Sequence, residues 1–289
     1  MHFVQAKGIL SARNGMNLYR GCMHGCIYCD SRSACYQMHH PFEDIEVKEN
    51  AIELLSQTLR SKRKKGMIAT GSMSDPYMPI EQTLHMTHQS MECALKHGFG
   101  YTVLTKSDHI LDDLDVLRQL HQKTRCVVQM TLTCMDDELS RIIEPGVCPT
   151  SRRIEVLKIL QKEGIPTVVW LCPVLPYLTD TKENITGIVN ACHKAGVWGI
   201  ICFGMGVTLR EGNREYFYDC LDRHFPGLKQ KYIRTYGQSY TCSSIHHNRL
   251  MHLFHDLCRK YNIEDDPDRI FDYLQYFEEK KKAEQLTLF

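Results

Sequence analysis

Short apolar runs alternate with longer amphipathic stretches through most of this chain. The apolar runs predict strands at residues 67–70, 101–105, 126–133, 167–173 and 199–204. The amphipathic stretches that follow them predict helices at residues 81–97, 110–122, 152–163, 182–195 and 211–223. Near-continuous apolar strands that alternate with helices indicate a parallel sheet covered by helices.

The chain begins with a lead-in over residues 1–14, and residues 15–20 predict a first short strand. Residues 47–65 keep helical spacing, and Gly66 ends that helix. About six strand–helix units fit an α/β fold, a partial (β/α) barrel, in which chemistry lies at the C-terminal ends of the strands. A doubly wound sheet is the alternative, but no G-x-G-x-x-G sequence follows the first strand.

The pattern changes after residue 225. We predict that residues 1–225 form the barrel with its lead-in, and that residues 226–282 form a small helical appendage that closes its open side. The appendage has helices predicted at residues 248–261 and 268–282, after an aromatic and basic stretch. Its aromatic side chains either stack on nucleic-acid bases or pack within the appendage. They are Tyr232, Tyr236 and Tyr240.

Composition is that of an ordinary soluble protein, with 43% hydrophobic and 24% charged residues. The net charge of +1 neither favours nor opposes nucleic-acid binding, which would need a local patch. The first residues lack a charged segment followed by an apolar one, and prolines interrupt the apolar run at residues 168–178. Most of the 14 cysteines are scattered singly. We therefore expect a cytoplasmic protein that does not enter a membrane.

Three cysteines follow the first predicted strand, Cys22, Cys26 and Cys29. Their spacing can place three thiolates on one face of a short loop. Such a set matches three corners of a cubane iron–sulfur cluster and leaves the fourth iron open. The alternative is structural zinc with Cys35 or His24 as the fourth ligand, although no second CxxC pair is present.

The CxxxCxxC spacing, with Tyr28 just before the third cysteine, resembles the cluster loop of the radical SAM superfamily. The resemblance implies a [4Fe-4S] cluster on the three cysteines, whose open iron binds S-adenosyl-L-methionine. It also implies reductive cleavage of that cofactor to a 5′-deoxyadenosyl radical, which removes a hydrogen atom from a substrate. An external one-electron donor is then a required partner.

A second stretch, T-G-S-M-S-D-P-Y at residues 70–77, resembles the spore photoproduct lyase-like branch of this superfamily, also called DNA repair photolyase-like. The resemblance covers residues 7–225. It extends to T-K-S at residues 105–107, E-P-G at residues 144–146 and P-V-L-P at residues 173–176.

The same resemblance implies a set of cofactor contacts. Lys106 would bind the cofactor carboxylate through a charge-assisted hydrogen bond. The alternative is that Lys106 is a solvated loop lysine, and that hydroxyl groups at strand ends only cap helices. The further residues assigned to cofactor binding are Tyr28, Ser72, Ser74 and Thr131.

The chain departs from the true lyases at two positions that we assign to catalysis. Ser72 stands where those enzymes carry a hydrogen-donating cysteine, and Asp30 stands where they carry a tyrosine. An alcohol O–H is a poorer hydrogen-atom donor than a thiol, and a carboxylate cannot relay a hydrogen atom. We therefore do not expect dimer splitting by the lyase route, and Asp30 acts as a base or as a polar loop residue.

Other charged or metal-ligating residues have simpler interpretations. Arg152 and Arg153 begin a helix, where the anion of Glu144 would offset the unfavourable helix dipole. The histidine pairs at residues 39–40 and 246–247 do not share a face, so we interpret them as loop histidines.

The last residues, 283–289, form a tail after a charged stretch. Its sequence Q-L-T-L-F resembles the peptide by which bacterial replication and repair proteins bind the sliding clamp. The alternative is that these residues fold back onto the barrel. The clamp-binding side chains would be Gln285, Leu286, Leu288 and Phe289.

Taken together, these patterns predict a radical SAM enzyme that acts on damaged or modified nucleic acid, with DNA as a partner. One alternative is modification of a protein, peptide or small metabolite by the same radical. Another is a non-catalytic adaptor stapled by zinc. Iron content distinguishes the adaptor from the enzymes, and DNA binding distinguishes the two kinds of enzyme.

Overall fold

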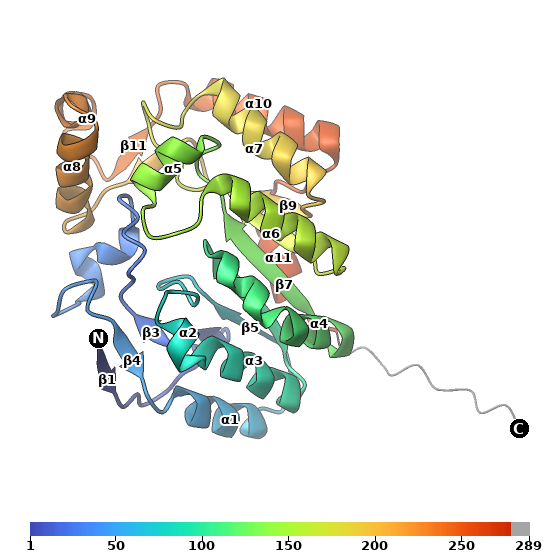
Figure 1. The fold of residues 1–289 in the computed structure, drawn as a ribbon. Helices are drawn as coiled ribbons and strands as arrows, with labels where there is room; N and C mark the ends of the chain where they lie inside the picture. The colour runs from blue at the N-terminus through green and yellow to red at the C-terminus, as the bar shows by residue number, and fades with distance from the viewer. Residues whose placement is uncertain (279–289) are drawn as a thin grey trace, which may run out of the picture.

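A computed structural model of the chain describes residues 1–278 (Figure 1). Its main sheet has six strands, all parallel, that neighbour one another in the order in which they occur in the chain. In a doubly wound sheet the strand order would reverse part-way. The partial (β/α) barrel is therefore confirmed. The strands are β2 (Gly15–Met16), β5 (Met67–Thr70), β6 (Gly100–Thr105), β7 (Cys126–Thr131), β8 (Thr167–Trp170) and β9 (Gly199–Ile201).

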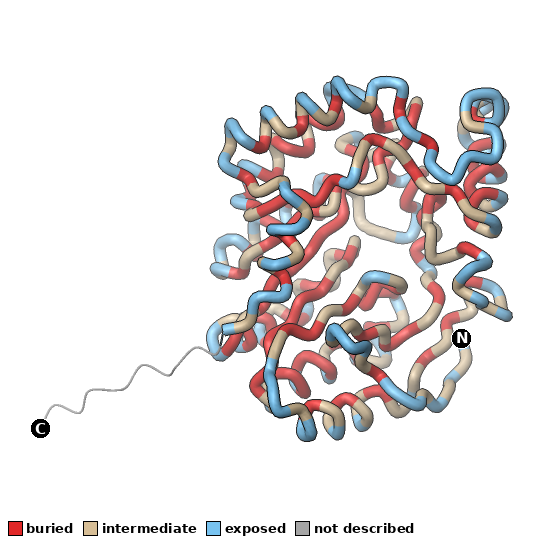
Figure 2. The backbone as a smooth tube through the Cα atoms, turned by 180° about the vertical axis from the view of Figure 1, so that it is seen from behind, coloured by how far each residue is buried: buried red, intermediate tan, exposed pale blue. Residues whose placement is uncertain are grey.

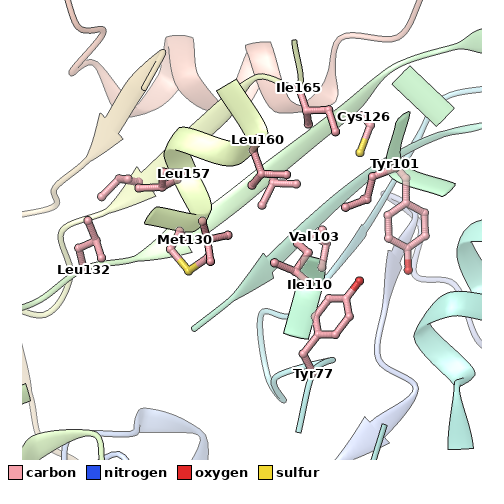
Figure 3. Packing of buried hydrophobic residues seen from close by; sticks show 14 of the residues in the cluster. Tyr77, Tyr101, Val103, Ile110, Cys126, Met130, Leu132, Leu157, Leu160 and Ile165 are labelled. Carbon is pink, nitrogen blue, oxygen red and sulfur yellow. The ribbon is translucent and has the colours of Figure 1, made fainter. Parts of the chain in front are cut away.

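Amphipathic helices cover the outer face of this sheet (Figure 1). Met130 of β7, for example, shares a buried cluster with Leu157 and Leu160 of α6 (Figure 3). Burial of such side chains stabilises the fold by about 25 cal/mol per Å² of apolar surface. Figure 2 shows that buried residues are concentrated in the strands and on the inward sides of the helices. The helices are α1 (Ala51–Ser61), α3 (Met86–His97), α4 (Leu114–Lys123), α6 (Thr150–Lys162), α7 (Lys182–Lys194) and α10 (His247–Tyr261), which packs on α7.

A helix also covers part of the opposite, inner face of the sheet. Ile270 and Leu274 of α11 (Pro267–Gln275) cluster with the strand residues Val127 and Val168. The next residues along these strands, Val128 and Val169, belong instead to the cluster with the outer helices. Side chains alternate between the two faces along a strand, so α11 lies inside the partial barrel. Within residues 1–278 no helix is long and apolar enough to cross a membrane.

The predicted first strand at residues 15–20 is wrong as one element. Gly15–Met16 (β2) joins the main sheet, whereas Tyr19–Arg20 (β3) pairs antiparallel with β4 (Glu46–Lys48) in a second sheet. The same β4 pairs with β1 (His2–Val4), a strand that the sequence did not suggest. These pairings also delay the first helix, which begins at Ala51 and not at residue 47.

Two long predicted helices are each divided. Residues 81–97 form α2 (Glu81–Leu84) and α3, because His85 between them adopts a left-handed conformation with φ of 50°. Residues 110–122 begin within a 3-10 helix, Asp108–Asp113, before α4 starts. The α5 helix (Asp137–Ile143) went unpredicted because its seven residues are too few to show helical periodicity.

The segment after β9 packs against the cysteine loop. Tyr232 and Cys242 share a buried cluster with Cys26 and Tyr28. The division into a barrel and an appendage at residue 225 stays a prediction, and residues 279–289, with the proposed tail, lie outside the described part. The elements here are β10 (Gly206–Thr208), α8 (Asn213–His224), α9 (Leu228–Tyr236) and β11 (Thr241–Ser243).

Candidate active site

The three loop cysteines surround one cavity at the C-terminal ends of β5 and β6. Cys22, Cys26 and Cys29 line it from the loop, together with the segment 71–75 after β5 and the segment 104–106 at the end of β6. All three are free thiols. The loop thus reaches the edge of the sheet where barrel enzymes carry their chemistry.

Two glycines allow the loop to take this path. Gly21 has φ of 88°, and a Cβ there would lie 2.4 Å from the carbonyl oxygen of Phe42. Gly25 has φ of 65°. Both lie in the left-handed region that side chains disfavour, so glycine is required at Gly21 in particular.

The spread of the thiols fits a cluster better than a single metal ion. Zinc–sulfur bonds of about 2.3 Å place two sulfurs on one ion at most ~4.6 Å apart. Among residues 1–278, the three cysteines do not form a group whose ligand atoms all lie within 4.8 Å of one another. In a cubane each thiolate binds a different iron, so the three sulfurs need not lie within that distance of one another. Cys35, offered above as a zinc ligand, is exposed, and its sulfur lies 3.2 Å from Arg210.

His24 and Asp75 form a buried pair beside the first cysteine. The Nδ1 atom of His24 lies 3.4 Å from Asp75, whose carboxylate also accepts hydrogen bonds from Thr105 Oγ1 at 2.7 Å and the Lys106 amide at 2.8 Å. Burial alone would lower the pKa of His24, but Asp75 and the Cys22 thiol raise it to about 10. The same burial would raise the pKa of Asp75, and the charge of His24 holds it below its usual value.

The His24–Asp75 pair changes the pKa of the neighbouring Cys22 thiol. Burial raises the pKa of Cys22, but hydrogen bonding and charge from His24 outweigh it, so its pKa is lowered overall. A lowered pKa favours the thiolate, which is the form that binds metal. Burial raises the pKa of Cys26 and Cys29. His24 is therefore a site residue, and its role could not be derived from its place between two cysteines alone.

Lys106 brings a positive charge to the cavity. Burial would lower its pKa, but the nearby Cys26 thiol and Glu144 carboxylate raise it, so the ammonium remains charged. A charged ammonium at the end of β6 suits a carboxylate ligand. Its contact with the cofactor stays a prediction.

The turn at residues 144–146 supports the cysteine loop. The hydroxyl of Tyr28 donates a hydrogen bond to Glu144, which also pairs with Arg153 at 2.6 Å. The Gly146 amide donates to the His24 carbonyl at 2.8 Å, and a Cβ on Gly146 would lie 2.7 Å from the same oxygen. Tyr28, assigned above to cofactor binding, thus directs its hydroxyl to Glu144. The predicted ion pair between Arg153 and Glu144 is therefore present in the structure.

The predicted hydroxyl contacts differ in their surroundings. Ser74 Oγ donates to the Gly21 carbonyl at 2.5 Å and so holds the cysteine loop. Ser72 is exposed and lines the cavity. Thr131 is buried at the end of β7, and its carbonyl accepts from Arg153 at 3.0 Å. The assignment of these residues to cofactor binding stays a prediction.

Asp30 directly follows the third loop cysteine and lies among hydrogen-bond donors. Its carboxylate accepts from Ser33 Oγ at 3.1 Å and Tyr36 Oη at 3.0 Å. Arg210, which follows β10, lies 3.5 Å away and donates to Tyr240 Oη at 2.8 Å. The Asp30 carboxylate therefore connects the cysteine loop to the C-terminal segment that holds Arg210. No sequence pattern indicated this contact.

Comparison with known proteins agrees with this geometry. The family model of the radical SAM superfamily matches residues 16–186, more than half of the chain. The chain belongs to the radical SAM superfamily. Radical SAM enzymes use a [4Fe-4S] cluster and S-adenosyl-L-methionine, and these are the cofactors of this protein. The predicted family and cofactors are confirmed.

Several relatives of this radical SAM protein are uncharacterized. One from Mycobacterium tuberculosis is 28% identical over 263 residues, 89% of this chain and 77% of the relative. One from Methanocaldococcus jannaschii is 31% identical over 179 residues, 61% of this chain and 66% of the relative. A Pseudomonas phage M6 protein named as a radical SAM Nalpha-GlyT isomerase is 24% identical over 175 residues, 61% of this chain and 35% of that protein.

Solved structures of spore photoproduct lyase share the fold. One variant of that enzyme has a TM-score of 0.63 at 13% identity, covering 90% of this chain and 78% of the lyase. Another, solved with AdoMet and dinucleoside spore photoproduct, has a TM-score of 0.59 at 12% identity, covering 86% and 73%. At such low identity the likeness extends to the fold alone.

Proposed function

We propose that this radical SAM enzyme acts on nucleic acid and modifies a nucleotide held over the cysteine loop. The observation that carries its radical chemistry is the convergence of three thiols and the Lys106 ammonium on one cavity at the strand ends. Cys22, Cys26 and Cys29 would hold the cluster, and Lys106 would neutralise the cofactor carboxylate. When bound, the cluster and S-adenosyl-L-methionine supply a 5′-deoxyadenosyl radical that removes a hydrogen atom from the substrate.

The chain's own residues prepare this site. His24, held by Asp75, favours the thiolate form of Cys22 and so prepares it to bind iron. Ser74 anchors the loop backbone at the Gly21 carbonyl, and Gly146 anchors it at the His24 carbonyl. These contacts position the ligands for the cluster within the folded chain.

A nucleic-acid substrate is supported by aromatic and cationic side chains at two places outside the cysteine cavity. Arg210 lies 4.9 Å from the ring centre of Tyr240, which is 47% exposed. A groove of about 780 Å³ at the beginnings of α7 and α10 is lined by Tyr177, by the cations of Lys182 and Arg249, and by the carboxylates of Asp180 and Glu183. Exposed aromatic rings can stack on bases, and cations can contact phosphates.

One structure of the same fold favours the same substrate class. A spore photoproduct lyase variant has been solved with a dinucleoside photoproduct bound. Ser72 and Asp30 replace the hydrogen-transfer groups of the lyases, so we propose modification of a base and not dimer splitting.

The test is anaerobic incubation of the protein with S-adenosyl-L-methionine, dithionite and single-stranded DNA, followed by mass analysis of nucleosides and 5′-deoxyadenosine. We expect a new nucleoside mass with wild type and none with Cys26→Ala. Cofactor cleavage that DNA never stimulates, together with no change in any nucleoside, would instead favour a protein, peptide or metabolite substrate. Absence of cofactor cleavage by iron-loaded protein would contradict the assigned site.

We further propose two partners for this enzyme. An external one-electron donor must reduce the cluster. The residues Gln285, Leu286, Leu288 and Phe289, which lie outside the described part of the chain, would bind the bacterial sliding clamp and so raise the local concentration of enzyme on DNA.

A further inference from the structure

A second group of metal-ligating side chains lies on the small sheet, apart from the cysteine cavity. His2, His40 and Asp44 each offer one ligand atom, and these atoms lie within 4.8 Å of one another. Within residues 1–278 it is the only group of three or more histidine, cysteine or acidic residues that meets this distance. Its members are partly exposed, so an ion can enter from solvent.

The backbone places these side chains. His2 of β1 is in register with Glu46 of β4, so both side chains project from the same face of the sheet. The His2 amide donates to the Ile45 carbonyl at 2.9 Å. The Asp44 amide donates to the Pro41 carbonyl at 2.9 Å and closes the turn between His40 and Asp44. The donor atoms are therefore brought together by main-chain pairing, which lowers the entropy cost of binding an ion.

The imidazole of His40 is prepared to act as a ligand. Its Nδ1 atom lies 3.1 Å from the Pro41 carbonyl, which can only accept, so Nδ1 donates its N–H there, and in the neutral imidazole Nε2 is left with the lone pair. That Nε2 atom is shielded from solvent and has no hydrogen-bond partner. A buried polar atom without a partner is costly. Metal-bound histidines commonly donate their other ring N–H to a carbonyl in this way.

The distances approach those around one ion. His2 Nδ1 lies 3.0 Å from Asp44 Oδ2, and His40 Nε2 lies 3.6 Å from Glu46 Oε2. Two ligands at about 2.0–2.1 Å from a tetrahedral zinc ion lie ~3.3 Å apart. The amino group of Met1, 2.9 Å from Asp44, contacts Oδ1, the other oxygen of that carboxylate.

We propose that His2, His40 and Asp44, with Glu46 as a fourth ligand, bind one divalent transition-metal ion of the zinc class. Two imidazoles and two carboxylates suit zinc and its neighbours in the first row. His39 and His40 both lie in a loop, as predicted, and under this proposal only His40 is also a metal ligand.

The ion would stabilise the turn that holds the first cysteine of the radical SAM site. Phe42 lies in this turn, lines the cysteine cavity, and accepts a hydrogen bond from the Cys22 amide at 3.1 Å. Arg32 stacks on the Phe42 ring at 4.4 Å. A metal that fixes His40 relative to Asp44 therefore fixes Phe42 between them. Its role would be structural and independent of which substrate the enzyme takes.

The test uses the holoenzyme with its cluster in place, so that the loop thiols are occupied. We expect one zinc ion per chain beyond the iron, measured by metal analysis after desalting. In competition with a chromophoric chelator, His40→Ala and the near-isosteric Asp44→Asn should weaken zinc binding at least tenfold. His39→Ala, in the exposed neighbour, should bind as wild type.

Two further measurements test whether the zinc ion is bound by the proposed histidines and carboxylates. Cobalt in place of zinc should give weak visible bands, without the intense near-ultraviolet charge transfer of thiolate ligation. Zinc should raise the unfolding temperature of wild type and His39→Ala but not of His40→Ala. The proposal is overturned if no ion binds beyond the cluster, if both histidine variants lose zinc equally, or if cobalt shows thiolate ligation.

Discussion

The hydroxyl of Tyr28 donates a hydrogen bond to the carboxylate of Glu144, and both side chains are buried. Tyr28 precedes the third cysteine of the loop, whereas Glu144 lies at the C-terminal end of α5, more than a hundred residues later in the chain. The same carboxylate forms an ion pair with Arg153, and both charged groups are fully buried. The cysteine loop therefore rests on a buried charge pair.

Glu144→Gln should destabilise the protein strongly. The substitution leaves the Arg153 guanidinium buried without its anion, which typically costs about 3–5 kcal/mol. Anaerobic urea denaturation measures the loss. Glu138→Gln, an exposed change on the same helix, is the matched control and should stay within about 0.5 kcal/mol of wild type. Equal effects of the two changes would show that Glu144 does not support the loop.

Iron content should follow the three loop cysteines. We expect about four irons and four sulfides per chain in protein purified without oxygen. Changing Cys22, Cys26 and Cys29 to Ala should remove the iron and abolish cofactor cleavage. Cys35→Ala should leave both intact, because that thiol is exposed and contacts Arg210. Loss of iron in Cys35→Ala would mean that the ligand set is wrong.

The stability of the protein should fall as pH rises above about 6.5, in a way that depends on His88. Partial burial would lower the pKa of His88, but its hydrogen bond to Asp113, with a 2.7 Å separation, raises it overall. A folded pKa above the unfolded value of about 6.5 means that the contribution is complete below that pH. It is lost as pH rises through the folded pKa.

We therefore expect wild type to lose more stability than His88→Gln over this range. Denaturation at each pH measures it, with His252→Gln, an exposed histidine on α10, as the control. A slope unchanged by His88→Gln would refute the assignment.

Cofactor cleavage should occur without repair of spore photoproduct. Ser72 and Asp30 cannot pass a hydrogen atom as the lyase groups do, so dinucleoside spore photoproduct should remain unchanged in a chromatographic assay. Ser72→Cys should introduce measurable repair if Ser72 occupies the donor position. Robust repair by wild type would contradict this. The donor would then be sought at Cys172, which is partly exposed after β8, before the buried Cys134.

Deletion of residues 285–289 should abolish binding to the bacterial sliding clamp. Two leucines and a phenylalanine in a short peptide would fill a preformed apolar groove of the clamp. A titration of the clamp with full-length and truncated protein measures the difference. A Leu286→Ala, Phe289→Ala double variant at full length serves as a second comparison. Equal binding by intact and truncated protein would remove the tail from the proposal.

The sequence alone determined the barrel and the reactive loop of this protein. Strand and helix periods are local properties of a chain, so the runs at residues 67–70 and 126–133 could be assigned to strands from their own residues. The cysteine spacing is likewise local, because Cys22, Cys26 and Cys29 lie within one loop. Local patterns were enough for the fold class, the family and the cofactors.

Only the tertiary structure decided which distant residues meet. Asp30 pairs with Arg210, Tyr28 with Glu144, and His2 with Asp44, and each partner comes from a separate element. No periodicity links such positions, since their approach depends on how whole elements pack. The division of residues 15–20 between two sheets has the same cause. Tyr19–Arg20 pairs with β4, which comes later in the chain, and so leaves the main sheet. The residues of 15–20 alone do not indicate this pairing.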